Sequence, residues 1–177
     1  MRKLILAAAG GVLALSLAIH AASAGPDKVQ IPMTYASSYV KIATIDRYDN
    51  KTVRTVYMNP EAWAAAKPGE PLPDGTTLIL EGRSARLGPD GQPMLDANGR
   101  FIPTDQIVLI ATQQKRRGWG TEYPENIRNG EWEYAVFQTN GSLNTGANLQ
   151  PCMQCHKPRA ADDFTMVAAR IVKDQKK

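Results

Sequence analysis

Near its C-terminal end the chain carries two thiols and an imidazole in close succession: Cys152, Cys155 and His156. A C-x-x-C-H sequence is the attachment signature of a c-type haem, because each thiol can add to one vinyl group of the haem. The residue after the second thiol is then held beneath the iron, where an imidazole supplies an axial ligand. The spacing therefore predicts one covalently attached haem c, with His156 as the proximal iron ligand.

Three other interpretations of the two cysteines fit less well. A zinc site needs four ligands, and the chain contains no further cysteine. A thioredoxin-like dithiol sits early in a βαβ unit, whereas this pair lies close to the C-terminus. A plain disulfide would leave the adjacent histidine unexplained.

The histidine count limits the other iron ligand, because the chain contains only His20 and His156. Once the N-terminal segment that holds His20 is removed, bis-histidine ligation, a His–Asp triad and a two-histidine metal site are excluded within one chain. The sixth iron position is then held by methionine, lysine, another weak ligand or water, or is open. Met166 lies only ten residues after His156, a short return for a thioether ligand, and the other candidates are Met33, Met58 and Met94.

The N-terminus has the organisation of a secretory signal peptide. Arg2 and Lys3 precede a nearly continuous apolar run over residues 4–19, and Ala22-Ser23-Ala24 is a small-residue cleavage site. The run is shorter than the roughly 20 residues of a membrane span, which argues against an uncleaved anchor. We predict that residues 1–24 are removed, and that residues 25–177 form a single haem-binding domain exported to the periplasm.

The mature chain has a size usual for one domain and little net charge. Loss of Arg2 and Lys3 leaves 19 basic and 17 acidic residues, which lowers the formal net charge from +4 to +2. No basic stripe with interleaved aromatic residues is present, so nucleic acid is not an expected partner, and neither is a membrane after cleavage. The short basic run Lys115-Arg116-Arg117 is interpreted as a solvated strand end.

Apolar alternation and turn residues predict a strand-rich domain. Asn59-Pro60 is expected to start a short helix. Residues 119–128 are expected to form a loop with a short helix, and residues 88–103 an excursion made of turns. Residues 25–38 look irregular, and residues 162–172 fit a helix or a strand equally well. Most c-type electron carriers are small and helical with an early C-x-x-C-H, so this order argues against that fold. The expected strands are 39–47, 52–58, 76–85, 106–112 and 132–138.

Several segments resemble the cytochrome P-460 family and the related cytochromes c′-beta, over residues 39–168. They are V-Y-M-N-P-E-A (56–62), P-L-P-D-G-T (71–76) running into a strand that ends at Glu81, the strand 132–137 and the late C-x-x-C-H. The resemblance implies a mainly β (α+β) domain, an antiparallel sheet with a few short helices and the haem packed on one sheet face. It also implies a homodimer and five-coordinate iron with a pocket for small nitrogen-oxide ligands.

The family's two branches differ in chemistry. The P-460 branch has a lysine cross-linked to the haem and oxidises hydroxylamine, whereas the c′-beta branch lacks the link and binds nitric oxide or carbon monoxide. Strand 76–85 offers no lysine, and Lys67 and Lys115 are the alternatives. We therefore expect a periplasmic cytochrome that binds or transforms nitric oxide or hydroxylamine, with a possible periplasmic redox partner. A His/Met-ligated electron-transfer cytochrome c is the alternative.

Glu81 is the candidate catalytic residue outside the haem motif. It follows the apolar triplet Leu78-Ile79-Leu80, and a carboxylate in a partly dry haem pocket would have a shifted pKa and could relay protons. The alternative is a solvated strand end. Arg54 and Arg83 each have two similar interpretations. The side chain either neutralises a haem propionate or lies on a solvated face of its strand. The remaining aromatic side chains are expected to pack in the core or at the haem edge: Trp119, Trp132, Tyr134 and Phe137.

Overall fold

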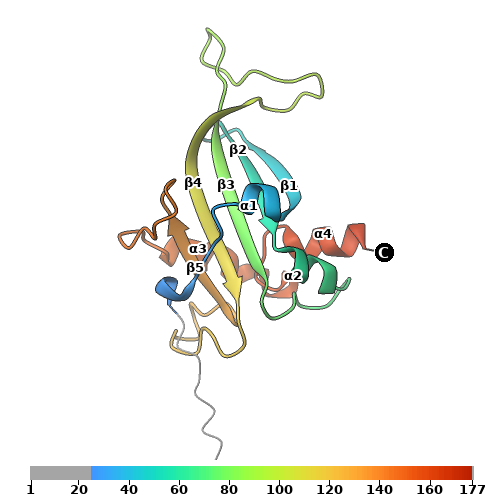
Figure 1. Cartoon of the computed structure of the whole chain (residues 1–177), viewed down its shortest axis with the longest axis vertical. Helices are drawn as coiled ribbons and strands as arrows, with labels where there is room; N and C mark the ends of the chain where they lie inside the picture. Colours follow the sequence, from blue (N-terminus) through green and yellow to red (C-terminus); the bar gives the residue numbers. More distant parts are fainter. Residues whose placement is uncertain (1–24, 177) are drawn as a thin grey trace, which may run out of the picture.

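The computed structural model describes residues 25–176, so the predicted signal peptide lies outside the described residues. Five strands form one antiparallel sheet in the order β1-β2-β3-β4-β5 (Figure 1). Each strand pairs with the next along the chain, and the predicted mainly β class with a few short helices is confirmed. The strands are β1 (Val40–Arg47), β2 (Thr52–Met58), β3 (Thr77–Ala85), β4 (Pro103–Lys115) and β5 (Trp132–Phe137).

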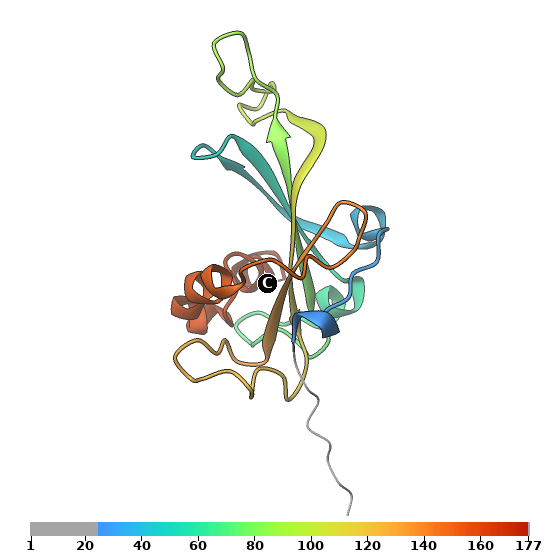
Figure 2. The ribbon, with the colours of Figure 1, turned by 90° about the vertical axis from the view of Figure 1, so that its left-hand side faces the viewer.

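Short helices flank the sheet on both sides. Figure 2 shows α3 and α4 on one side, with η1 and α1 on the other. Residues 162–172, which the sequence left undecided between helix and strand, comprise the end of η2, a loop over 163–167 and the first part of α4. Among residues 25–176, no helix combines the length and apolarity that crossing a membrane requires. The helices are η1 (Pro26–Lys28), α1 (Tyr35–Ser38), α2 (Pro60–Ala65), α3 (Gln150–His156), η2 (Lys157–Asp162) and α4 (Ala168–Gln175).

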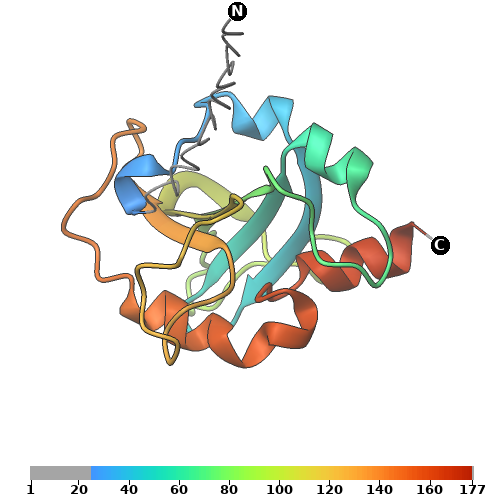
Figure 3. The ribbon, with the colours of Figure 1, turned by 90° about the horizontal axis from the view of Figure 1, so that it is seen from below.

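The two faces of the sheet carry separate cores, because successive side chains of a strand point to opposite faces. In β2, Val56 and Met58 belong to the core shared with α3 and α4, whereas Tyr57 belongs to the core under η1 and α1. We call the first face the helix face and the second the opposite face; Figure 3 shows both layers. The helix face carries α3, so it is the face on which the C-x-x-C-H motif lies.

Four local expectations differ from the structure. Residues 119–128 form successive turns with no helix, and η1 and α1 lie in the stretch expected to be irregular. Strand β4 is longer than expected at both ends. Its last residue, Lys115, is buried at 8% exposure, so the predicted solvated strand end is wrong at this position. The loop around Asp163 packs over it and supplies an ionic partner.

Glu133 in β5 is a fully buried carboxylate with no salt bridge among the described residues. It accepts hydrogen bonds from the Tyr123 hydroxyl at 2.8 Å and from the Tyr134 backbone N–H at 2.9 Å. Burial raises its pKa above the ordinary value of about 4.3, and these hydrogen bonds only partly offset that effect. The folded protein therefore holds this proton over a pH range in which the unfolded chain has released it.

We expect Glu133→Gln to remove a pH dependence of stability. In the range between the ordinary and the raised pKa the folded state binds more protons, so the wild-type free energy of unfolding falls as pH rises. The variant lacks this term, so its stability relative to wild type should increase with pH across that range. Urea unfolding at a series of pH values measures the difference. Glu125→Gln, at an exposed site, should give a flat difference, and a flat result for Glu133→Gln would contradict the expectation.

Candidate haem site

Helix α3 positions the two thiols. Pro151 occupies its first turn, where the missing N–H costs no helical hydrogen bond. Cys152 and Cys155 are three residues apart and so lie on the same side of the helix. Both thiols are free in the structure, with Cys152 partly buried and Cys155 exposed. One helix therefore presents two separate thiols to the same region.

The environment of Cys152 argues against a redox dithiol. Burial raises the pKa of its thiol, whereas the attacking cysteine of a redox C-x-x-C motif has a lowered pKa. A protonated thiol is neither a good nucleophile for disulfide exchange nor a ready metal ligand. Among residues 25–176, no three histidine, cysteine or acidic side chains lie together as a metal ion would require.

His156 is the last residue of α3, and its ring is held in one tautomer. Its Nδ1 lies 2.7 Å from the backbone carbonyl oxygen of Phe164. Because a carbonyl can only accept a hydrogen bond, Nδ1 carries the proton and Nε2 keeps a free lone pair. Burial lowers the pKa of the imidazole, and the bond to Phe164 opposes this only partly. The ring is thus neutral, with Nε2 available, which is the form in which histidine ligates iron.

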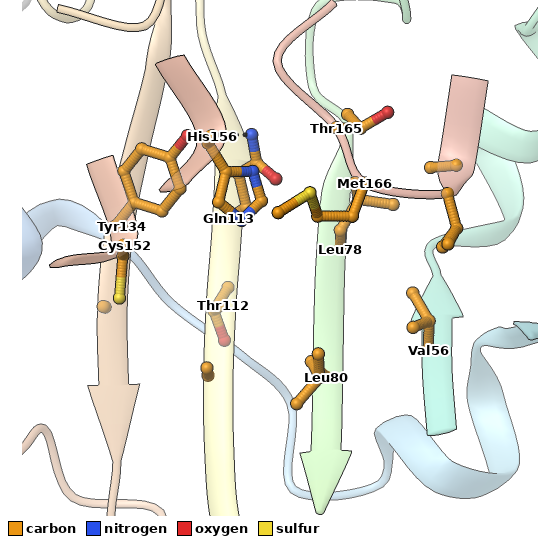
Figure 4. A pocket seen from close by; sticks show the side chains of 14 residues that line it. Val56, Leu78, Leu80, Thr112, Gln113, Tyr134, Cys152, His156, Thr165 and Met166 are labelled. Atoms are coloured by element: carbon orange, nitrogen blue, oxygen red, sulfur yellow. Dashed lines mark hydrogen bonds between the residues drawn. The ribbon is translucent and has the colours of Figure 1, made fainter. Parts of the chain in front are cut away.

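A largely apolar cavity opens on the helix face beside His156 and Cys152 (Figure 4). The cavity has a volume of about 110 Å³ and is open to solvent on one side. On β2 and β3 its sheet wall is aliphatic (Val56, Leu78 and Leu80), whereas β4 and β5 contribute Ala111 and Ala135 together with the polar residues Thr112, Gln113 and Tyr134. The cavity, the two thiols and the neutral imidazole together fit a haem attached through α3.

Neither lysine considered from the sequence is directed at this cavity. Lys115 donates to the Leu72 carbonyl at 2.9 Å and pairs with Asp163 at 2.9 Å. Lys67 is exposed and lies 3.8 Å from Glu70. On β3 the residues that line the cavity are Leu78 and Leu80, and none of its lining residues in the described chain is a lysine.

The structure does not bring Glu81 together with the haem motif. Leu78 and Leu80 face the cavity, so Glu81 points to the opposite face. There it is 3% exposed. It accepts a 2.6 Å hydrogen bond from the Tyr35 hydroxyl and pairs with Arg83 at 2.6 Å. It is therefore neither a residue of this cavity nor a solvated strand end, and it ties α1 to the sheet.

The two arginines considered with Glu81 are also separated. Arg83 is committed to Glu81 on the opposite face. Arg54 lies two residues before Val56 on β2, so it shares the helix face with the cavity and is only partly exposed. Of the two, only Arg54 remains placed to meet an acidic group at the edge of the cavity.

Residues beside His156 form a polar network that sequence reasoning missed. Tyr134, expected only to pack, lies edge-on to the His156 ring at 5.2 Å between centroids. Its hydroxyl accepts hydrogen bonds from Gln113 Nε2 at 3.2 Å and from Asn129 Nδ2 at 2.9 Å. No sequence signal singles out Gln113, which follows the expected strand 106–112 and is succeeded by the polar residues Gln114 and Lys115.

The fold and the site define a haem-binding domain in which an antiparallel sheet faces a C-x-x-C-H helix across an apolar cavity. The family model described as Cytochrome P460 matches residues 32–167, which is most of the chain. The chain belongs to the cytochrome P460 family, and it is accordingly a c-type haem protein of the P460 type. A comparison with curated proteins gave no match.

Proposed function

We propose that the protein is a periplasmic mono-haem cytochrome that binds nitric oxide, or transforms it or hydroxylamine, at an open iron position. In this proposal Cys152 and Cys155 hold the haem covalently, and His156 ligates the iron. The observation that carries the proposal is the neutral His156 ring, with Nε2 free, lining a largely apolar cavity. When bound, the haem supplies an iron centre that can take a small ligand.

The polarity of the cavity favours an uncharged diatomic ligand. The valine and leucine side chains on β2 and β3 offer no hydrogen bond to water, so a small apolar gas competes well for that part of the cavity. The lining contains no lysine and no carboxylate in the described chain, and Glu81 lies on the opposite face. Oxidation of hydroxylamine releases protons and needs groups to accept them. These features favour ligand binding over hydroxylamine turnover.

Export, a homodimer and a periplasmic redox partner are part of the proposal as well. Export is supported by the sequence of residues 1–24, which lies outside the described residues. The homodimer is supported by the family resemblance alone. Nucleic acid is not proposed as a partner, because the mature chain has almost no excess of basic residues.

One observation supports the electron-transfer alternative. Met166 lines the same cavity as His156 (Figure 4). A thioether on the iron would fill the sixth position and make a low-spin carrier. However, Met166 lies only two residues after Phe164, whose carbonyl oxygen accepts the hydrogen bond of His156 Nδ1 on the side of the ring away from Nε2. A sixth ligand has to bind iron from the side opposite the imidazole, which makes Met166 a poorly placed donor.

We expect the reduced protein to be high-spin and to bind carbon monoxide and nitric oxide, because no strong sixth ligand blocks the iron. Absorption spectra before and after each gas measure this. Met166→Leu is the matched variant, since it removes the sulfur and keeps the apolar volume; it should leave the spectrum unchanged. A low-spin spectrum that ignores carbon monoxide in wild type and becomes high-spin in Met166→Leu would establish the carrier instead.

A further inference from the structure

The carbonyl oxygen that orients His156 has a second hydrogen-bond donor. His156 Nδ1 lies 2.7 Å from the Phe164 oxygen, and Gln113 Nε2 lies 2.9 Å from the same atom. Both donated protons draw electron density from one oxygen, so each bond is weaker than it would be alone. The strength of the hydrogen bond at Nδ1 in turn sets how basic the imidazole is at Nε2.

We propose that Gln113 is a positioning residue that weakens the electron donation of His156 to the iron by sharing the Phe164 carbonyl. The inference rests on the proposed ligation of the iron by His156, and it adds a residue that acts on the iron without touching it. A carbonyl bound only by His156 would accept more strongly and would make the imidazole more like an imidazolate. Gln113 prevents this.

The side chain of Gln113 is held in the one orientation that can do this. It is 6% exposed, and its Nε2 donates both protons, one to the Phe164 carbonyl and one to the Tyr134 hydroxyl at 3.2 Å. The reversed amide would place oxygen against oxygen at Phe164 and is excluded. Asn129 binds the same hydroxyl at 2.9 Å and fixes it from the other side. The amide is therefore locked between two acceptors.

The Phe164 carbonyl is also held in place, so it cannot turn toward one donor. Asp163 and Phe164 both have left-handed backbone angles, with φ of 50° and 54°. This conformation is strained for residues other than glycine and persists only where the surroundings enforce it. Here the Asp163 carboxylate accepts from the Leu72 N–H at 2.9 Å and pairs with buried Lys115. A strained and anchored turn thus presents one oxygen to two fixed donors.

The chain offers a closely matched control for Gln113. Gln114 is the next residue of β4 and is equally buried, at 6% exposure. Its amide binds the Thr77 hydroxyl at 2.8 Å on the opposite face of the sheet and does not reach Phe164. The same substitution at the two positions removes the same buried amide, but only one of them changes the acceptor of His156.

The iron–histidine stretching vibration of the reduced haem, measured by resonance Raman, tests the proposal. Gln113→Leu should shift it to higher frequency, because the freed carbonyl strengthens the bond at Nδ1, whereas Gln114→Leu should leave it unchanged. Gln113→Asn, which keeps an amide but is one methylene too short, should give the same upward shift and serves if Gln113→Leu does not assemble. An unchanged or lower frequency in a folded Gln113 variant would overturn the proposal. Absence of the vibration from wild type would instead show that the reduced iron is not five-coordinate with His156 as its ligand, which overturns the proposed function on which this inference rests.

Discussion

The double variant Cys152→Ala/Cys155→Ala is expected to lose all of its covalently held haem. Each thiol can form one thioether, so the wild-type protein should keep its haem on the polypeptide after denaturation and extraction with acidified ketone. Each single variant should retain one link, and the double variant none. The intact mass of periplasmic material should show wild type without residues 1–24 and with the mass of one haem added.

Gln154→Ala is the control for this experiment, because Gln154 is exposed and lies between the two thiols on α3. It should keep the full mass of the haem. His156→Ala separates attachment from ligation: the thiols remain, but the iron loses its protein nitrogen and little stable holoprotein should accumulate. Free extraction of haem from the wild-type protein would show that Cys152 and Cys155 do not carry it.

The sequence predicted the donor set of the candidate site because that chemistry depends on residue types at a fixed spacing. It also predicted segments that overlap all five strands, with β2 correct at both ends. It could not predict which face Glu81 takes. Leu78-Ile79-Leu80 is a continuous apolar run, as expected for a strand buried on both faces, so alternation assigns no inside or outside. Only the packing of α3 and α4 on the side of Leu78 and Leu80 decides it.

The remaining parts of the site depend on contacts between distant segments. The acceptor of His156 is a backbone carbonyl, which carries no residue identity that a sequence could reveal. Gln113 donates to this carbonyl although it lies 51 residues earlier in the chain, and Lys115 pairs with Asp163, which lies 48 residues later. A lysine at the end of a strand is normally solvated. Here the loop after η2 returns over β4 and makes Lys115 part of the interior.

Loss of this lysine should destabilise the protein strongly. The Lys115 and Asp163 side chains are only 10% and 12% exposed, and the ammonium also donates to the Leu72 carbonyl and lies 5.7 Å above the Trp132 ring. Lys115→Met keeps most of the apolar stem but leaves the Asp163 carboxylate buried without a cation. Removing one partner of such a pair costs about 3–5 kcal/mol. Urea unfolding of the holoprotein measures the loss.

Two further variants separate the uncompensated charge from lost packing. Arg117→Met changes an exposed residue of the same basic run and should leave stability almost unchanged. Lys115→Met/Asp163→Asn removes both charges, and asparagine tolerates the left-handed backbone at position 163, so the double variant should recover much of the loss. If Lys115→Met is as stable as Arg117→Met, the ion pair does not hold the turn. The left-handed turn at Asp163 and Phe164 must then be held by its hydrogen bonds, among them those of the Phe164 carbonyl with Gln113 and His156 and that of the Leu72 N–H with Asp163.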